Sequence, residues 1–241
     1  MLQQTRGIVF KSIKYGETSL ISKIYTEHYG LQSYIVKGIR TSKSKMKAGL
    51  LQPLTLLDMQ VYRRENKNLQ YLRELSPAII FTEIPFDVRK SSVGIFMIEI
   101  LLQSIKEEET NPVLFNYLFE TINELDKTKK SIKDFHLHFL IHLSKLLGFF
   151  PSGNFSEKNN YFDLQEGIFT SSAPPHPLFL SDNSAKVFSL LIQSAIKKSV
   201  SDFNNSERKE LLNNILTYYS LHISNFKTIR SVKVLEEVMR G

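Results

Sequence analysis

Residues 16–47 read GETSLISKIYTEHYGLQSYIVKGIRTSKSKMK, and the first third of the chain is arranged around this stretch. It holds two apolar segments, residues 18–26 and 31–37, on either side of a short polar turn that ends at Gly30. Both segments are rich in β-branched and aromatic residues, which is typical of β-strands. Lys23 is the first cation of the stretch, which closes in a loop that carries no acid and five cationic residues: Lys37, Arg40, Lys43, Lys45 and Lys47. Two strands that lead into a basic loop are well suited to hold a polyanion.

Further strand-like segments lie on both sides of this stretch. Residues 6–15 precede it, residues 49–62 follow the basic loop, and residues 69–75 form either a last strand or a short helix. Pro53 suggests a bulge or an edge position within the segment 49–62. Five short strands joined by polar turns predict a small β-barrel. A five-stranded barrel with a basic face is typical of the OB-fold.

After residue 81 the apolar residues recur in three- and four-residue steps, which indicates amphipathic helices. We expect helices over residues 87–106, 112–125, 131–147, 184–198, 205–224 and 229–239. Residues 149–182 are irregular, with a candidate hairpin formed by 161–164 and 168–169. The predicted fold class is α+β with several domains. An OB-fold barrel over residues 1–80 precedes an all-helical domain over residues 81–241, which contains the irregular insertion at about 149–182.

The composition excludes several kinds of chemistry. The 241 residues are 42% hydrophobic and 23% charged, which is ordinary for a soluble globular protein. The absence of cysteine excludes disulfides, thiolate metal ligands and a cysteine nucleophile. The start of the chain does not resemble a secretory signal, and no apolar run is long enough to cross a bilayer. We therefore expect a cytoplasmic protein that does not enter the membrane.

The net charge of +7 is confined to one part of the chain. Residues 1–83 carry 13 Lys and Arg against 6 Asp and Glu, whereas residues 84–241 carry 18 of each. Such asymmetry indicates an electrostatic partner for the first part, most often a nucleic acid. A merely basic, solvated surface remains the alternative.

The candidate DNA-contacting residues are the cations of the strands and loops, together with one aromatic residue. Each Lys or Arg that reaches a phosphate displaces a condensed counterion, which favours binding at low salt. Tyrosines in the same third of the chain are able to stack on unpaired bases, although Tyr25 and Tyr34 are also the two best suited to a barrel core. The candidates are Lys37, Arg40, Lys43, Lys45, Lys47, Lys11, Lys23, Arg63 and Tyr34; the other tyrosines are Tyr15, Tyr29 and Tyr62.

Catalytic and metal-binding motifs do not stand out in the sequence. It contains no phosphate-binding GxxxxGK[ST] loop, no GxGxxG and no GxSxG. His138 and His142 have the spacing of two metal ligands on a helix, but Phe139 stands where a zinc protease motif has its glutamate. We therefore expect a protein that is not an enzyme and uses no metal or cofactor. A hydrolase in the helical domain is the rival hypothesis.

The order of short motifs along the chain resembles the RecO family of bacterial recombination mediators. The motifs are Gly7-Ile8-Val9, Gly16-Glu17-Thr18, Thr26-Glu27 with Gly30, Lys37-Gly38 with Arg40, residues 42–45, Leu51-Gln52-Pro53-Leu54, Leu147-Gly148-Phe149 with Pro151, and finally His222 and Ser231. The resemblance implies an N-terminal OB-fold, a helical domain, and binding and annealing of single- and double-stranded DNA. It also implies partnership with RecR and with the C-terminal tail of single-stranded DNA-binding protein, and thus indirect help to RecA at the bacterial nucleoid.

One departure from that family concerns the insertion at residues 149–182. Many relatives carry two CxxC pairs there, which form a zinc ribbon, whereas this chain has no cysteine. We expect a zinc-free insertion held together by aromatic residues: Phe155, Tyr161, Phe162, Phe169 and Phe179. Because an OB-fold surface does not by itself choose DNA over RNA, an RNA-binding OB-fold protein is the second hypothesis.

Overall fold

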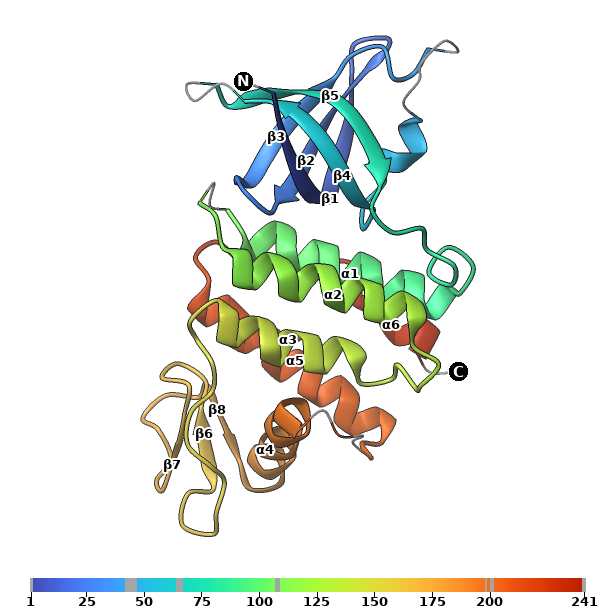
Figure 1. Ribbon diagram of the computed structural model, residues 1–241. Helices are drawn as coiled ribbons and strands as arrows, with labels where there is room; N and C mark the ends of the chain where they lie inside the picture. The colour runs from blue at the N-terminus through green and yellow to red at the C-terminus, as the bar shows by residue number, and fades with distance from the viewer. Residues whose placement is uncertain are drawn as a thin grey trace. The chain divides into compact units, whose positions relative to one another are not determined.

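The computed structural model describes residues 2–41, 47–63, 67–106, 109–197, 199 and 202–239 (Figure 1). The chain divides into two compact units, residues 1–129 and 130–241. The first unit contains the strands β1 to β5 and the helices α1 and α2. The units do not coincide with the predicted ranges 1–80 and 81–241, and the domain boundary therefore stays a prediction.

The first unit is built on a closed five-stranded barrel, which confirms the predicted OB-like fold (Figure 1). The strands follow the order β1-β2-β3-β5-β4, and β4 closes the barrel by pairing with β1. Only the β3–β5 pair is parallel among the five pairs of the barrel. The strands are β1 (Leu2–Tyr15), β2 (Ser19–Thr26), β3 (Gly30–Val36), β4 (Leu56–Tyr62) and β5 (Leu69–Pro77). The last of these settles the choice between strand and helix for residues 69–75.

The predicted strand over residues 49–62 is only half correct. Its first part is a short 3-10 helix, η1 (Ala48–Leu51), and strand pairing begins at Leu56. Pro53 cannot donate a backbone hydrogen bond, and Leu54 has a positive φ of 75°, so the chain turns between the two elements. The Leu54 amide donates to the Val9 carbonyl oxygen at 2.9 Å, which holds this turn against β1.

The barrel encloses an apolar core that reaches from β1 across to β5. Val9, Ile24, Val36 and Leu57 are fully buried in it. Gly7 permits the strands to approach closely there, because a Cβ atom at this position would lie 2.6 Å from Cγ2 of Ile24.

The helices α1 (Val88–Ser104) and α2 (Pro112–Lys127) extend this core. Asp87 and Asn111 cap their N-termini by accepting hydrogen bonds from backbone amides of the first turn. The ring of Tyr25 in β2 lies between those of Phe10 in β1 and Phe115 in α2. Its centroid is 5.8 Å from that of Phe10 and 6.1 Å from that of Phe115. The barrel and α2 therefore share one aromatic cluster.

A buried carboxylate ties the segment between β5 and α1 to the end of α2. Asp126 accepts hydrogen bonds from the amides of Thr82, Glu83 and Ile84, with N–O distances of 2.9 to 3.1 Å. The Nζ of the buried Lys90 donates to the Asp126 carbonyl oxygen at 2.7 Å. Burial raises the pKa of the Asp126 carboxyl, but the backbone hydrogen bonds outweigh it and hold that pKa below its ordinary value.

The second unit contains four helices and a three-stranded sheet among the described residues (Figure 1). The helices are α3 (Phe135–Leu146), α4 (Asp182–Lys197), α5 (Asn205–His222) and α6 (Val232–Met239). The expected hairpin is present as β6 (Tyr161–Asp163) and β7 (Ile168–Thr170), and β8 (Phe179–Ser181) adds an unexpected third strand beside β6. None of the helices in the described ranges is long and apolar enough to cross a membrane.

Aromatic packing and the polar contacts of Asp163 hold the insertion around β6 and β7. The ring of Phe162 is buried, and its centroid lies 4.8 Å from those of Phe169 and Phe188. Asp163 accepts the amides of the following turn and lies 3.3 Å from Nε2 of His176. Where the structure describes the chain, no three histidine, cysteine or acidic side chains are placed to hold a metal ion. Of the five expected aromatics, Phe162 and Phe169 are buried, and the others are half-buried: Phe155, Tyr161 and Phe179.

Candidate nucleic-acid interface

Two of the candidate lysines form a cross-strand pair on the outside of the barrel. Lys11 of β1 lies directly opposite Lys23 of β2, and both side chains are exposed. Residues in register on an antiparallel pair project from the same face, and like charges in this arrangement destabilise the sheet. A bound anion would offset that repulsion. The pair is therefore a suitable place for a phosphate group.

Two exposed tyrosines form a second cross-strand pair on the barrel surface. Tyr62 of β4 lies in register with Tyr71 of β5, and they are 42% and 39% exposed. The Nζ of Lys37 lies 5.2 Å from the centre of the Tyr71 ring. Aromatic rings beside a cation are the combination that holds unpaired bases and their phosphates.

Tyr71 is a candidate that the sequence prediction missed. Its strand alternates between buried Gln70 and Leu72 and exposed Tyr71 and Arg73. This period of two places Tyr71 on the outer surface. This alternation indicates an exposed Tyr71 only if residues 69–75 form a strand, and their sequence was equally compatible with a short helix.

The prediction that Tyr34 contacts DNA is wrong. Tyr34 is 1% exposed and belongs to the barrel core, where it packs with Val61 and Leu72. Burial raises the pKa of its hydroxyl, in keeping with a side chain withdrawn from water. Tyr25 is also buried, but it packs against Phe10 and against Phe115 of α2, whereas Tyr15 at the end of β1 is exposed.

Two of the candidate arginines are engaged with neighbouring groups. The guanidinium carbon of Arg63 lies 4.7 Å from the centre of the Tyr29 ring. Nη1 of Arg40 donates to the Glu17 carbonyl oxygen at 2.9 Å, which ties the basic loop to the turn between β1 and β2. Both side chains remain exposed. An exposed guanidinium beside an aromatic ring or a carbonyl oxygen still carries its positive charge, which attracts phosphate.

The structure brings only some of the candidates together. The Lys11–Lys23 pair lies on the paired strands β1 and β2, Lys37 directly follows β3 and lies beside Tyr71 of β5, and the exposed Lys47 precedes η1. Lys43 and Lys45 lie outside the described residues, so their part in the interface stays a prediction.

The second unit contains a small groove with an apolar floor and a cationic rim. The groove has a volume of about 80 Å³, with Leu212, Leu235 and Met239 among its apolar lining residues. The cations around it are Lys133, Arg208 and Lys209. Nε of Arg208 donates to Oδ1 of Asp134 at 2.7 Å, which positions the guanidinium at the rim. This arrangement suits a ligand that joins an apolar tip to a negative charge.

His136 also lines this groove but adds no positive charge near neutral pH. It is buried, and burial is the main reason that its pKa falls to about 3. The nearby positive charge of Arg208 lowers it further. The positive charge of the rim therefore comes from the lysine and arginine side chains, and Glu236, whose Oε2 lies 3.5 Å from Nζ of Lys209, offsets part of it.

Comparisons with known proteins agree with this architecture. A family model described as "Recombination protein O N terminal" matches residues 1–81, and one described as "Recombination protein O C terminal" matches residues 85–229. The chain is 37% identical over 238 residues to the "DNA repair protein RecO" of Flavobacterium psychrophilum, with 98% of each chain covered. It is 36% identical over 240 residues to the protein of that name from Bacteroides fragilis, with 99% of each covered. The value for the same-named protein of Azobacteroides pseudotrichonymphae is 32% over 239 residues, again with 99% of each covered. The chain therefore belongs to the recombination protein O family.

Proposed function

We propose that this protein binds DNA and anneals complementary strands during recombinational repair. In this role it works with RecR and single-stranded DNA-binding protein in the bacterial cytoplasm, at the nucleoid, and helps RecA to load. The observation that carries the proposal is the outer surface of the barrel, where Lys11 pairs with Lys23 and where Lys37 lies beside Tyr71. Family membership supports the same reading, because the relatives are named as DNA repair proteins.

The mechanism needs no covalent step by the protein. Two complementary strands repel each other through their phosphates, and a cationic surface that binds both of them lowers this repulsion. Tyr62 and Tyr71 stack on unpaired bases and keep them exposed for pairing. The duplex that forms has no free base faces to stack on these rings, so product binding relies on the phosphates alone.

A strand-annealing measurement tests the proposal directly. Two complementary oligonucleotides, one with a fluorophore and one with a quencher, are mixed with the full chain over a series of salt concentrations. We expect faster annealing at low salt and a steep loss of the effect as salt rises. The same measurement is repeated with DNA coated by single-stranded DNA-binding protein, and with RNA strands of the same sequence. No acceleration of DNA annealing, or acceleration of RNA alone, would overturn the proposal.

Removing both exposed tyrosines should weaken binding to single strands more than binding to duplex DNA. Stacking on an aromatic residue contributes about 1–3 kcal/mol per base. We therefore expect the variant Tyr62→Ala/Tyr71→Ala to bind single-stranded DNA at least about tenfold more weakly. Fluorescence anisotropy with matched single- and double-stranded probes measures the difference. The control Tyr62→Phe/Tyr71→Phe keeps both rings and should bind as the unaltered protein does. Equal losses for both probes would contradict a stacking role.

We also infer that the groove between α3, α5 and α6 receives the acidic, apolar-tipped tail of single-stranded DNA-binding protein. The apolar floor suits the tip, and Lys133 and Lys209 at the rim suit the carboxylates. The groove is smaller than a cavity of about 150 Å³ that encloses benzene, so an aromatic tip would be only partly enclosed. This supports a weak, reversible contact.

A labelled peptide with the sequence of that tail tests the assignment by anisotropy. We expect Lys133→Ala/Lys209→Ala to weaken peptide binding about 2- to 30-fold, the range for two exposed ion pairs. Lys186→Ala in α4 is the matched control, because Lys186 is exposed and does not line the groove. If the control and the double variant lose affinity equally, the tail binds elsewhere.

A further inference from the structure

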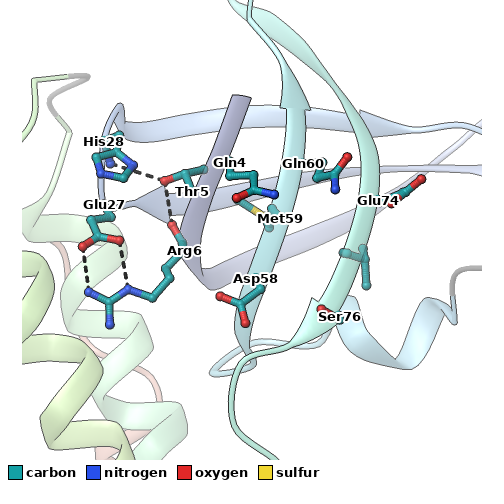
Figure 2. Close-up of a pocket in the computed structure, with 11 residues that line it drawn as sticks. Gln4, Thr5, Arg6, Glu27, His28, Asp58, Met59, Gln60, Glu74 and Ser76 are labelled. Atoms are coloured by element: carbon teal, nitrogen blue, oxygen red, sulfur yellow. Dashed lines mark hydrogen bonds and ion pairs between the residues drawn. The ribbon is translucent and has the colours of Figure 1, made fainter. Parts of the chain in front are cut away.

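A groove separate from the one between α3, α5 and α6 lies on the outer face of the barrel, over β1, β4 and β5. Its volume is about 520 Å³, and Figure 2 shows the residues that line it. Two cross-strand rows form its floor. Gln4, Gln60 and Glu74 are in register in one row, and the other row contains Asp58. The groove therefore presents side-chain amides and carboxylates in a regular array.

The second row runs through Arg6, Asp58 and Ser76, and the charge of Arg6 is already neutralised. Nε and Nη2 of Arg6 donate to the two carboxylate oxygens of Glu27 at 2.9 and 2.7 Å (Figure 2). Nη2 also donates to Oδ1 of Asn116. With Arg6 and Glu27 balanced, the other acidic lining residues are Asp58 and Glu74. The exposed ion pair of Glu74 with Arg73 is long, at 3.8 Å between Oε1 and Nε, so the groove stays negative. This is unusual in a part of the chain that carries an excess of seven positive charges.

The groove is unsuited to a nucleic-acid backbone but suits a cation. Asp58 and Glu74 repel phosphate, whereas they attract Lys or Arg side chains. The two residues are diagonal neighbours on adjacent strands, a relation that places Cα atoms roughly 7–8 Å apart. In an extended peptide, alternate side chains on one face are about 6.6–6.8 Å apart. The carboxylates therefore match basic residues at alternate positions.

We propose that this groove docks an extended, cationic segment of a protein partner, with Lys or Arg at alternate positions on Asp58 and Glu74. The side-chain amides of Gln4 and Gln60 lie in the same floor and are able to pair with the backbone of such a segment. The barrel is closed, so the partner binds through side chains and adds no strand to a sheet edge. This contact is separate from the proposed DNA surface.

The test uses the full chain and two fluorescein-labelled peptides of equal composition. In one peptide arginines alternate with serines, and in the other the arginines are contiguous. We expect the alternating peptide to bind more tightly and to lose affinity as salt rises. The isosteric variant Asp58→Asn/Glu74→Gln should weaken its binding about 2- to 30-fold, the range for two exposed ion pairs. DNA annealing by this variant should be unchanged.

A matched control removes two exposed carboxylates elsewhere. Glu157→Gln/Glu166→Gln alters the net charge equally in the second unit and should leave peptide binding unchanged. Equal binding of the peptide to the groove variant and to the unaltered protein would overturn the proposal. A groove variant that instead loses DNA affinity would overturn it as well, because the side chains would then contact bases. If the unaltered protein binds the alternating and the contiguous peptide equally well, the proposed match between the carboxylate spacing and alternate side chains is wrong.

Discussion

Replacing Asp126 with alanine is expected to lower the free energy of unfolding by about 3–5 kcal/mol. The carboxylate accepts three backbone amides and the hydroxyl of Thr82, and its removal leaves those donors without their acceptor. The buried ammonium group of Lys90 lies 3.8 Å from Oε2 of Glu83 and donates to the Asp126 backbone carbonyl oxygen, a contact that the substitution retains. Urea denaturation followed by circular dichroism measures the change.

The conservative variant and a matched control make this test specific. Asp126→Asn keeps one acceptor oxygen and should lose less stability than the alanine variant. Glu124→Ala lies two residues earlier on α2 with an exposed side chain, and we expect its effect to stay within about 0.5 kcal/mol. Hydrogen exchange should show faster exchange at the amides of Thr82, Glu83 and Ile84. A loss below about 1 kcal/mol for Asp126→Ala would contradict the role that we assign to this carboxylate.

The same carboxylate predicts how stability depends on pH. Its pKa in the folded chain lies below the ordinary value of 3.8, so the unfolded chain binds its proton more readily. The stabilisation is therefore fully present well above pH 4 and is lost as pH falls through the folded pKa. Stability curves of the unaltered protein and of Asp126→Asn should converge as the pH falls below about 4. Parallel curves over that range would show that Asp126 does not titrate with folding.

Removing three lysines of the basic loop should have the second large effect, this time on DNA binding. If Lys43, Lys45 and Lys47 each contact one phosphate, the variant with alanine at all three positions loses about two units of the salt slope for single strands. The corresponding loss of affinity is about 100-fold at 0.1 M salt. Annealing should slow in parallel, because the strands are no longer held on one surface. Salt titrations by anisotropy measure the slope.

The control for this experiment must remove the same charge from another place. Lys145, Lys158 and Lys186 are exposed lysines of the second unit, and their replacement by alanine lowers the net charge equally. We expect only a small change of slope for this control. An unchanged slope in the loop variant would reject the loop as a DNA contact. Equal changes in both variants would assign the effect to net charge alone.

The regular elements were predictable because their signals are local. The β-branched and aromatic composition of residues 18–26 and 31–37 and the three- and four-residue steps after residue 81 depend only on nearby residues along the chain. The same local patterns failed at η1, where Pro53 and the positive φ of Leu54 interrupt a segment of strand-like composition. They also missed β8, since three residues are too few to carry a period.

The candidate site was less accessible to such reasoning. Residue type placed Tyr34 among the DNA contacts, yet its ring lies in the core, while Tyr71 was overlooked and is exposed. Both are tyrosines on strands. Which of them faces the core and which faces water is decided only when the strands close into a barrel. The groove lined by Lys133 and Lys209 requires α3 to lie beside α5 and α6, which come much later in the sequence, and no local pattern contains that information.

The sequence by itself determined the succession of five strands and six helices, the concentration of positive charge in the first third, and the absence of thiolate chemistry. These follow from periodicity and composition, which every segment carries independently of the rest. Only the tertiary structure decided which cations stand together, which tyrosines face water, and that one side of a basic barrel is acidic. The physical reason is register. Strand pairing places Lys11 opposite Lys23 and Asp58 diagonal to Glu74, and such neighbours arise from contacts between distant parts of the chain.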